Sequence, residues 1–287
     1  AEVNQKFQQT LSAEKYAAYL EEFPENRLYG RMLNVGVRIR ENYNPFRQVD
    51  KLRWEGGDQQ ARTVSTARDL QAVNIPISVK AESKVVSNPS PYNLFIATPQ
   101  GLPPSKGEPS WYLQAEDEYQ AFYSYARTAT GMEDQPETVA AFEASRKKRP
   151  MVDAWKQISD PDVLAGAEPL YLGLAHRIAA NSAEQFNQNL SAALAARSRG
   201  AVLEHIAKMF FRMNAVDYIL CGIDERTEFA VQIPSLTAWL QRWQFNRITA
   251  RPDLDRGQSV VDFEIECERK DRSENFTAHF HAEVRWS

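Results

Sequence analysis

The residues best suited to chemistry lie between Asp69 and Lys80, in the stretch Asp-Leu-Gln-Ala-Val-Asn-Ile-Pro-Ile-Ser-Val-Lys. Its pattern predicts an extended segment that begins on a carboxylate, turns once, and returns as a strand. In the returning strand, isoleucine and valine occupy one face, while Ser78 and Lys80 occupy the other. Two neighbouring strands of this kind bring a metal-binding oxygen and an ammonium group to the same edge of a sheet. The stretch therefore predicts a hydrolytic site.

The order of acid, turn and apolar strand ending in lysine resembles the core of the PD-(D/E)xK nuclease superfamily. The sequence from Lys80 to Phe95 is similar to those of prokaryotic restriction endonucleases. The resemblance as a whole covers residues 50 to 100. Two residues depart from the family pattern. Arg68 stands where the family has proline, and Ser78 stands where it usually has Asp or Glu. Some restriction enzymes of this superfamily carry Ser-x-Lys and take the missing carboxylate from elsewhere in the fold.

The resemblance implies a Mg²⁺-dependent endonuclease of restriction or anti-phage type that hydrolyses double-stranded DNA. Asp69 and a second carboxylate would hold Mg²⁺ against the scissile phosphate, and Lys80 would orient the attacking water. Glu55 is the first choice for the second carboxylate because it follows an apolar and aromatic stretch, and Glu82 is the other choice. Ser78 would at most hydrogen-bond a metal-bound water. A symmetric dimer would suit cleavage of both strands.

Two groups of polar side chains are expected to contact DNA. The first surrounds the Gly56-Gly57 pair and offers donors that phosphates and base edges accept. The second is the densest basic run of the chain, which suits contact with the nucleic-acid backbone. Surface solvation explains the first group equally well. The residues concerned are Gln59, Gln60, Arg62, Arg68, Lys84, Arg146, Lys147, Lys148 and Arg149.

Two hairpins are predicted in the C-terminal part of the chain. The segments 216–223 and 229–233 are apolar and short, which predicts a buried hairpin. Residues 261–267 and 276–286 alternate strictly between apolar and polar types, which predicts a second hairpin with one buried face. One strand of that hairpin presents acids and the other presents His and Arg, so we expect cross-strand ion pairs.

A rival site lies on the last predicted strand. His279, His281 and Glu283 share one face, and the pattern His-x-His-x-Glu can hold a transition metal through neutral imidazoles. The alternative for this face is a solvated surface that pairs with the acids opposite. A further alternative for the whole chain is a catalytically inactive nucleic-acid-binding module of a larger nucleoprotein complex, with catalysis lost at Ser78.

The overall composition is that of an ordinary globular protein. The chain has 287 residues, a formal net charge of -4 and a pI near 5.7. This acidity argues against a protein that coats nucleic acid indiscriminately, but a nuclease can confine its basic residues to one cleft. Cys221 and Cys267 lie in apolar stretches and are expected to be buried thiols in a reducing compartment.

The prediction of where the protein is located depends on two kinds of targeting segment that the sequence does not contain. No apolar run reaches the roughly 18 residues of a membrane span, and the start shows no signal-peptide pattern. We expect a soluble protein with no membrane contact, and the resemblance implies the prokaryotic cytoplasm. The first residue is not methionine and the last strand stops at Ser287, so we expect a chain trimmed at both ends.

The patterns predict an α+β fold in three parts. It has a mixed β-sheet core flanked by helices, as the restriction-endonuclease resemblance implies, together with a helical insertion and a C-terminal antiparallel hairpin region. Residues 1–100 would form the nuclease-like core with N-terminal helices, and 110–213 a helical region able to contact DNA. Residues 214–287 would form a β-rich region packed on the core.

Some shorter segments carry predictions of their own. Tyr92 to Ala97 predicts a short strand, and Thr98 to Pro109 predicts a loop because it is rich in proline and glycine. The sequence Ser182-Ala-Glu-Gln185 matches a capping box, which predicts a helix that begins there and ends at Ala196. A later helix is expected to include Trp243.

Overall fold

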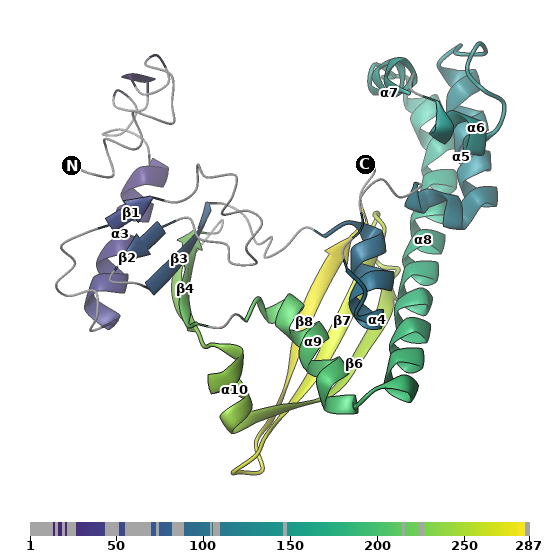
Figure 1. Ribbon diagram of the computed structural model, residues 1–287. Helices are drawn as coiled ribbons and strands as arrows, with labels where there is room; N and C mark the ends of the chain where they lie inside the picture. The colour runs from purple at the N-terminus through teal and green to yellow at the C-terminus, as the bar shows by residue number, and fades with distance from the viewer. Residues whose placement is uncertain are drawn as a thin grey trace. The chain divides into compact units, whose positions relative to one another are not determined.

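The chain forms two compact units, one from Ala1–Asn88 with Lys208–Arg242 and the other from Pro89–Ala207 with Trp243–Ser287. The computed structural model (Figure 1) describes residues 27–43, 52–54, 70–72, 75–81, 89–103, 105, 110–145, 148–213, 216–223 and 227–284, and residues 14, 17, 18 and 21. Both units cross the predicted boundaries of 1–100, 110–213 and 214–287. The predicted C-terminal part is divided, since its first hairpin belongs with the N-terminal sheet and its last strands belong with the helical region.

The first unit is built on a mixed five-stranded sheet. Its order is β1-β2-β3-β4-β5, with β3 and β4 parallel and the other neighbours antiparallel. Strand β4 is apolar along its length and almost wholly buried, as expected for a strand inside a sheet that is covered on both faces. The strands are β1 (Leu52–Trp54), β2 (Leu70–Ala72), β3 (Ile75–Ala81), β4 (Tyr218–Ile223) and β5 (Glu228–Ile233).

Helix α3 (Arg27–Asn42) covers one face of this sheet. Its buried residues Val35 and Ile39 join a core cluster that includes Ile77 of β3 and three residues of β4. Around this core, Arg31 and Arg38 of the helix lie 3.6 and 3.7 Å from the carboxylate of Glu228. Helix α3 is therefore held to β4 and β5 by apolar packing at the centre and by charge at the edge.

The second unit joins one long helix to an antiparallel three-stranded sheet (Figure 1). Helix α8 (Pro161–Ala196) begins where the Asp160 carboxylate accepts a hydrogen bond from the Asp162 amide at 2.9 Å, with Pro161 in the first turn. The sheet has the order β6-β7-β8, and its apolar face packs on α8. The strands are β6 (Trp243–Asp253), β7 (Val260–Arg269) and β8 (Asn275–Glu283).

The remaining helices of the described chain are short. They include a π-helical turn, a 3-10 helix and several α-helices. Their bounds are η2 (Asn93–Ala97), α4 (Thr98–Gln100), η3 (Trp111–Ala115), α5 (Glu116–Ala129), α6 (Val139–Ala144), α7 (Arg149–Lys156), α9 (Arg199–Phe211) and α10 (Leu236–Arg242).

Three local predictions are wrong. The predicted strand from Tyr92 to Ala97 is helical, and the helix continues through Gln100 into the predicted loop. The capping-box residue Ser182 lies inside α8, where its buried hydroxyl accepts a hydrogen bond from the Trp111 indole at 2.8 Å. Trp243 begins strand β6 and is not helical. Each of these predictions was based on a short local pattern, whereas contacts with distant parts of the chain determine the observed structure.

Strand β6 was not predicted from the sequence, although it has eleven residues. Its pairing with β7 shifts register between Phe245 and Arg247. A bulge of this kind inserts one extra residue and moves the following side chains to the other face, so the strict alternation of a strand is lost. The two predicted hairpins are confirmed as β4–β5 and β7–β8, whose strand registers show no shift. The first hairpin was expected to be buried, but only β4 is buried, and Val231 of β5 is 43% exposed.

Both cysteines are free and buried, as expected from their apolar surroundings. Burial raises the pKa of the Cys267 thiol to about 12, so this thiol stays protonated at neutral pH and is a poor nucleophile. Among the helices that the structure describes, none is both long enough and apolar enough to cross a membrane.

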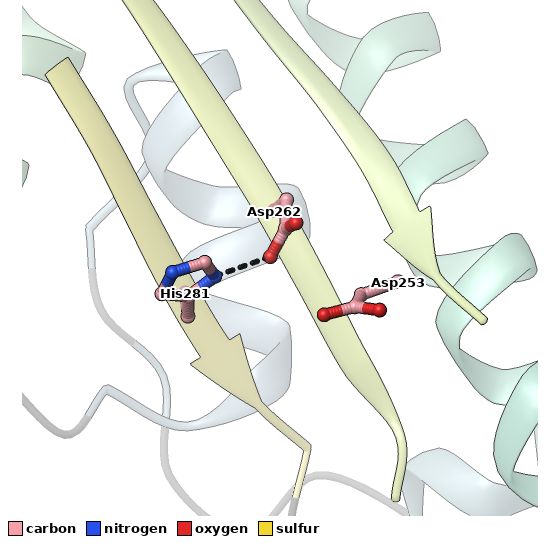
Figure 2. Close-up of side chains that lie close together, drawn as sticks. All are labelled: Asp253, Asp262 and His281. Carbon is pink, nitrogen blue, oxygen red and sulfur yellow. Dashed lines mark hydrogen bonds and ion pairs between the residues drawn. The ribbon is translucent and has the colours of Figure 1, made fainter. Parts of the chain in front are cut away.

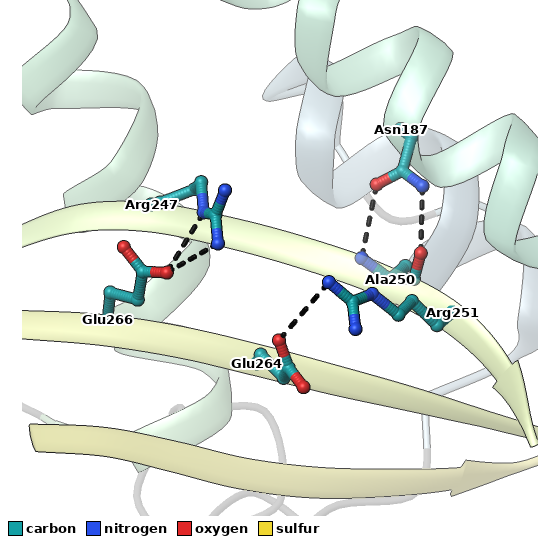
Figure 3. Close-up of polar contacts among 6 residues, drawn as sticks. All are labelled: Asn187, Arg247, Ala250, Arg251, Glu264 and Glu266. Carbon is teal, nitrogen blue, oxygen red and sulfur yellow. Dashed lines mark hydrogen bonds and ion pairs between the residues drawn. The ribbon is translucent and has the colours of Figure 1, made fainter.

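One side chain of α8 holds the edge of the three-stranded sheet (Figure 3). The amide of Asn187 donates to the Ala250 carbonyl at 2.8 Å and accepts from the Ala250 amide at 3.1 Å. Because β6 has a neighbouring strand on one side only, Asn187 supplies to Ala250 the pair of bonds that another strand would supply.

Replacing Asn187 with alanine should therefore leave two backbone groups of Ala250 unpaired. We expect a loss of about 1–3 kcal/mol in the free energy of unfolding, measured by urea denaturation. Gln188→Ala is the matched control, because its exposed side chain bonds Glu184 on the helix surface, and it should change stability by less than about 0.5 kcal/mol. Equal effects of the two substitutions would contradict this role of Asn187.

Candidate functional site

The predicted hydrolytic stretch forms two adjacent antiparallel strands. Leu70 of β2 pairs with Ile77 of β3, and Ala72 pairs with Ile75. Asp69 itself lies outside the described residues, but it directly precedes Leu70 in the chain. The two expected strands are thus confirmed as a pair, and residues 73 and 74 between them lie outside the described residues.

Strand β3 is an inner strand of the sheet. Ser78 pairs with Leu220 and Lys80 pairs with Gly222 in the parallel ladder with β4. Ile77 faces the core beneath α3, so residues one position away along β3 face the opposite side of the sheet. Ser78 therefore lies on that opposite face, as predicted. Lys80 is two residues further along the same strand, and its side chain lies outside the described residues.

Ser78 is fully buried, with 0% of its surface exposed. A charged carboxylate at such a position would lose its hydration, which is costly unless it is paired. A serine hydroxyl fits this interior position more easily than the Asp or Glu that the family pattern has there. Full burial does not fit direct contact between Ser78 and an ion that is open to solvent.

The other predicted catalytic and metal-binding groups lie outside the described residues. This holds for the whole of Glu55, Asp69 and Glu82, and for the side chain of Lys80. The part of the site that the structure describes is thus the backbone frame of β2 and β3, together with the buried Ser78 side chain.

Two of the predicted DNA-contacting residues are described, and both are paired with acids. The Lys148 ammonium forms an ion pair with Glu143, whose side chain is 7% exposed. The Arg149 guanidinium lies 3.3 Å from the Asp153 carboxylate on the surface of α7. These pairings reduce the charge that the two cations can offer to a phosphate. Outside the described residues lie Gln59, Gln60, Arg62, Arg68, Lys84, Arg146 and Lys147.

The outer face of the β6–β8 sheet carries ion pairs between β6 and β7, which were not predicted because β6 was not (Figure 3). Arg247 of β6 donates to the Glu266 carboxylate of β7 at 2.6 and 3.0 Å, and Arg251 lies 3.8 Å from Glu264. Glu268 of β7 accepts hydrogen bonds from the side-chain amides of Asn246 and Gln244 of β6. These bonds, mainly that of Asn246, lower the pKa of the Glu268 carboxyl. The predicted pairing was between β7 and β8, and the described contact of this kind is that of Asp262 with His281.

A compact group of possible metal ligands also lies on this outer face (Figure 2). Asp253 of β6, Asp262 of β7 and His281 of β8 place one ligand atom each within 4.8 Å of one another. His281 Nδ1 contacts the Asp262 carboxylate directly, and these two residues are opposite in the strand register. Asp253 also accepts a hydrogen bond from Arg256 at 2.7 Å.

This group differs from the predicted trio of His279, His281 and Glu283. Those three do share an exposed face of β8, as expected. However, same-face residues on a strand are about 6.6 Å apart or more, whereas neighbouring strands lie about 4.8 Å apart, so ligands converge more readily across strands. Among the described residues, the only group of three close ligand atoms is the one with Asp253 and Asp262.

Asp253 was not predicted as a ligand because the strand that carries it, β6, was not predicted. Asp262 is one of the acids that were predicted to face outward on strand β7. The alternation of apolar and acidic residues did not reveal which residue of the next strand lies beside Asp262. Two carboxylate oxygens and one imidazole nitrogen form a ligand set that suits a divalent transition metal better than Mg²⁺, which prefers oxygen ligands.

Comparison of the chain with protein-family models, with curated proteins and with solved structures gave no match.

Proposed function

We propose that this protein is a Mg²⁺-dependent endonuclease that cuts double-stranded DNA, with a restriction or anti-phage role in the prokaryotic cytoplasm. The observation that carries the proposal is the pairing of β2 with β3 inside a mixed sheet. The segment that follows Asp69 lies antiparallel to the strand that carries Ser78 and Lys80. The mixed sheet, with α3 packed on one face, also supports the restriction-endonuclease-like core.

The strand register supports a shared face for the two proposed catalytic groups. Gln71 pairs with Pro76, and Leu70 pairs with Ile77. If this register continues by one residue, Asp69 lies opposite Ser78, on the face that Lys80 shares. Cross-strand neighbours have Cβ atoms about 4.5–5.5 Å apart, and a residue two positions along the strand is about 7 Å away. Flexible side chains at these distances can contact one phosphate group.

In the proposed site the protein supplies oxygen ligands and one cation. Asp69, together with Glu55 or Glu82, would bind Mg²⁺, because carboxylate oxygens are the ligands this ion prefers. The bound ion would lower the pKa of a water molecule and neutralise charge on the phosphate. Lys80 would donate hydrogen bonds to the attacking water and to a phosphate oxygen as negative charge develops there. The buried Ser78 would support this face of the sheet from within.

A cleavage assay tests this proposal. The purified protein is incubated with unmodified phage DNA and supercoiled plasmid in Mg²⁺, in Ca²⁺ and in EDTA. We expect cleavage in Mg²⁺ and loss of cleavage in EDTA. Binding of DNA in a gel-shift assay without cleavage of any DNA would support the alternative of an inactive module in a larger nucleoprotein complex. Light scattering would show whether the active form is the proposed homodimer.

A second candidate function is metal binding by Asp253, Asp262 and His281, and the convergence of their ligand atoms favours it. Such a site would bind Zn²⁺ or Mn²⁺ on the outer face of the β6–β8 sheet. It replaces the predicted set of His279, His281 and Glu283 but uses the same strand.

Calorimetry with Zn²⁺ tests this second candidate. We expect His281→Ala to weaken binding by at least about tenfold, because even the loss of a residue that only orients a ligand costs about 10–100-fold. His279→Ala is the matched control, since His279 is exposed on the same face but outside the ligand group. Similar weakening by both substitutions, or no binding to the parent protein, would exclude this site.

A further inference from the structure

Helices of the second unit enclose an apolar pocket that neither proposed function uses. Its volume is about 620 Å³, and its walls come from α5, α6, α7 and α8. Most of the lining is aromatic or aliphatic, and it includes Phe122, Val152, Trp155, Leu164, Ala167 and Tyr171.

The aromatic walls pack against one another and leave few polar groups for a ligand. The Phe122 ring lies edge-on to Trp155 and tilted against Tyr171, with ring centres 5.7 Å apart in both pairs. The hydroxyls of Tyr119 and Tyr123 donate to Glu143 and to the Pro136 carbonyl, so they are already bonded within the protein. These two hydroxyls are therefore not free to bind an occupant, to which the pocket mainly offers ring faces and edges.

Two apolar side chains of the lining are exposed to solvent. Val152 is 40% exposed and Leu164 is 43% exposed, although both line the pocket. Apolar residues that stay exposed around a hollow are typical of a surface that is covered by a ligand or partner. The charged lining residues among those described are Lys156 and Glu168, one of each sign. Their charges cancel, which favours a neutral occupant over an anion or a cation.

The size of the pocket indicates the kind of occupant. Pockets for small molecules have volumes of roughly 300–1,000 Å³, and this one lies within that range.

We propose that the pocket formed by α5, α6, α7 and α8 binds a neutral, apolar small molecule, with its body against Phe122, Trp155 and Tyr171. The burial of apolar surface would provide the affinity. The site is independent of the β2–β3 edge and of the ligand group on the β6–β8 sheet, so it can exist whether or not either of those functions is correct.

Fluorescence titration with N-phenyl-1-naphthylamine, a neutral apolar probe, tests this proposal on the full chain. We expect saturable binding of one probe per chain. Leu164→Asp places a charge at the exposed edge of the pocket and should weaken binding by about tenfold or more. Ala167→Phe fills the pocket from a buried position on α8 and should abolish binding.

Each variant has a matched control outside the pocket. Leu254→Asp changes another exposed leucine, and Ala165→Phe changes an exposed residue of the same helix turn, so both should bind like the parent. If Ala167→Phe fails to fold by circular dichroism, the Leu164→Asp pair alone decides. Absence of saturable binding to the parent would overturn the proposal, as would equal weakening in the controls. It would also be overturned if Leu164→Asp dissociated a dimer without changing probe affinity, since the face would then be a subunit contact.

Discussion

Replacing Lys80 with alanine is expected to reduce Mg²⁺-dependent cleavage of double-stranded DNA by about 10²- to 10³-fold, the usual cost of removing one preorganised donor to the developing charge. Lys80 belongs to β3, an inner strand that pairs with β2 on one side and β4 on the other. Such a strand fixes the backbone position of residue 80, from which the proposed contact of the ammonium with the phosphate would be made. The measurement is the rate of plasmid linearisation at saturating Mg²⁺.

The control for this substitution is Lys208→Ala, which removes an exposed lysine of the same unit without changing β3. It should cleave at the rate of the parent. Asp69→Asn should lose activity to a similar extent as Lys80→Ala, because it removes a proposed metal ligand and keeps the size of the side chain. Parental cleavage by Lys80→Ala, in a protein that melts at the parent's temperature, would rule out the proposed role of this lysine.

Replacing Phe263 with alanine is expected to lower the free energy of unfolding of the second unit by about 3–5 kcal/mol, the usual cost of deleting a buried phenylalanine ring. Phe263 is 0% exposed and lies at the centre of the apolar face of the β6–β8 sheet. Its ring packs edge-on against Phe186 of α8, with centres 5.0 Å apart, and stacks on Phe95 with centres 6.1 Å apart. One truncation would therefore open a cavity between the sheet, α8 and η2.

Urea denaturation followed by circular dichroism measures this loss. Because the chain has two compact units, unfolding can occur in two transitions, and only the one assigned to the second unit should move. Thr277→Ala, on the exposed face of the same sheet, should change stability by less than about 0.5 kcal/mol. A loss below about 1 kcal/mol for Phe263→Ala would mean that the cavity collapses or that this contact matters little.

The two sites differ in how they depend on the rest of the chain. The proposed groups Asp69 and Lys80 come from one continuous stretch, and the strands β2 and β3 that pair there are neighbours in the chain. The ligands Asp253, Asp262 and His281 come from three strands and meet only when the β6–β8 sheet is complete. A substitution that disturbs the sheet should therefore affect metal binding before it affects DNA cleavage.

Local pattern was sufficient to predict the elements whose side chains repeat with a regular period. The alternation of Val261, Phe263 and Ile265 with acids predicted β7, and that of the residues opposite predicted β8. The segment after Asp69 predicted β2 and β3, and apolar surroundings predicted the burial of Cys221 and Cys267. These features depend on residues close together in the sequence, so the period of two or the local polarity reveals them directly.

Contacts between distant segments decided the rest. The parallel pairing of β3 with β4 joins residues near 80 to residues near 220, and no local pattern specifies that partner. Strand β6 was hidden by its bulge, and with it the place of Asp253 beside Asp262. Ser182 looked like a helix start but lies inside α8, because the Trp111 indole satisfies its hydroxyl there. In each case a side chain or strand finds its partner across the fold, and the free energy of that contact outweighs the preference of the local sequence.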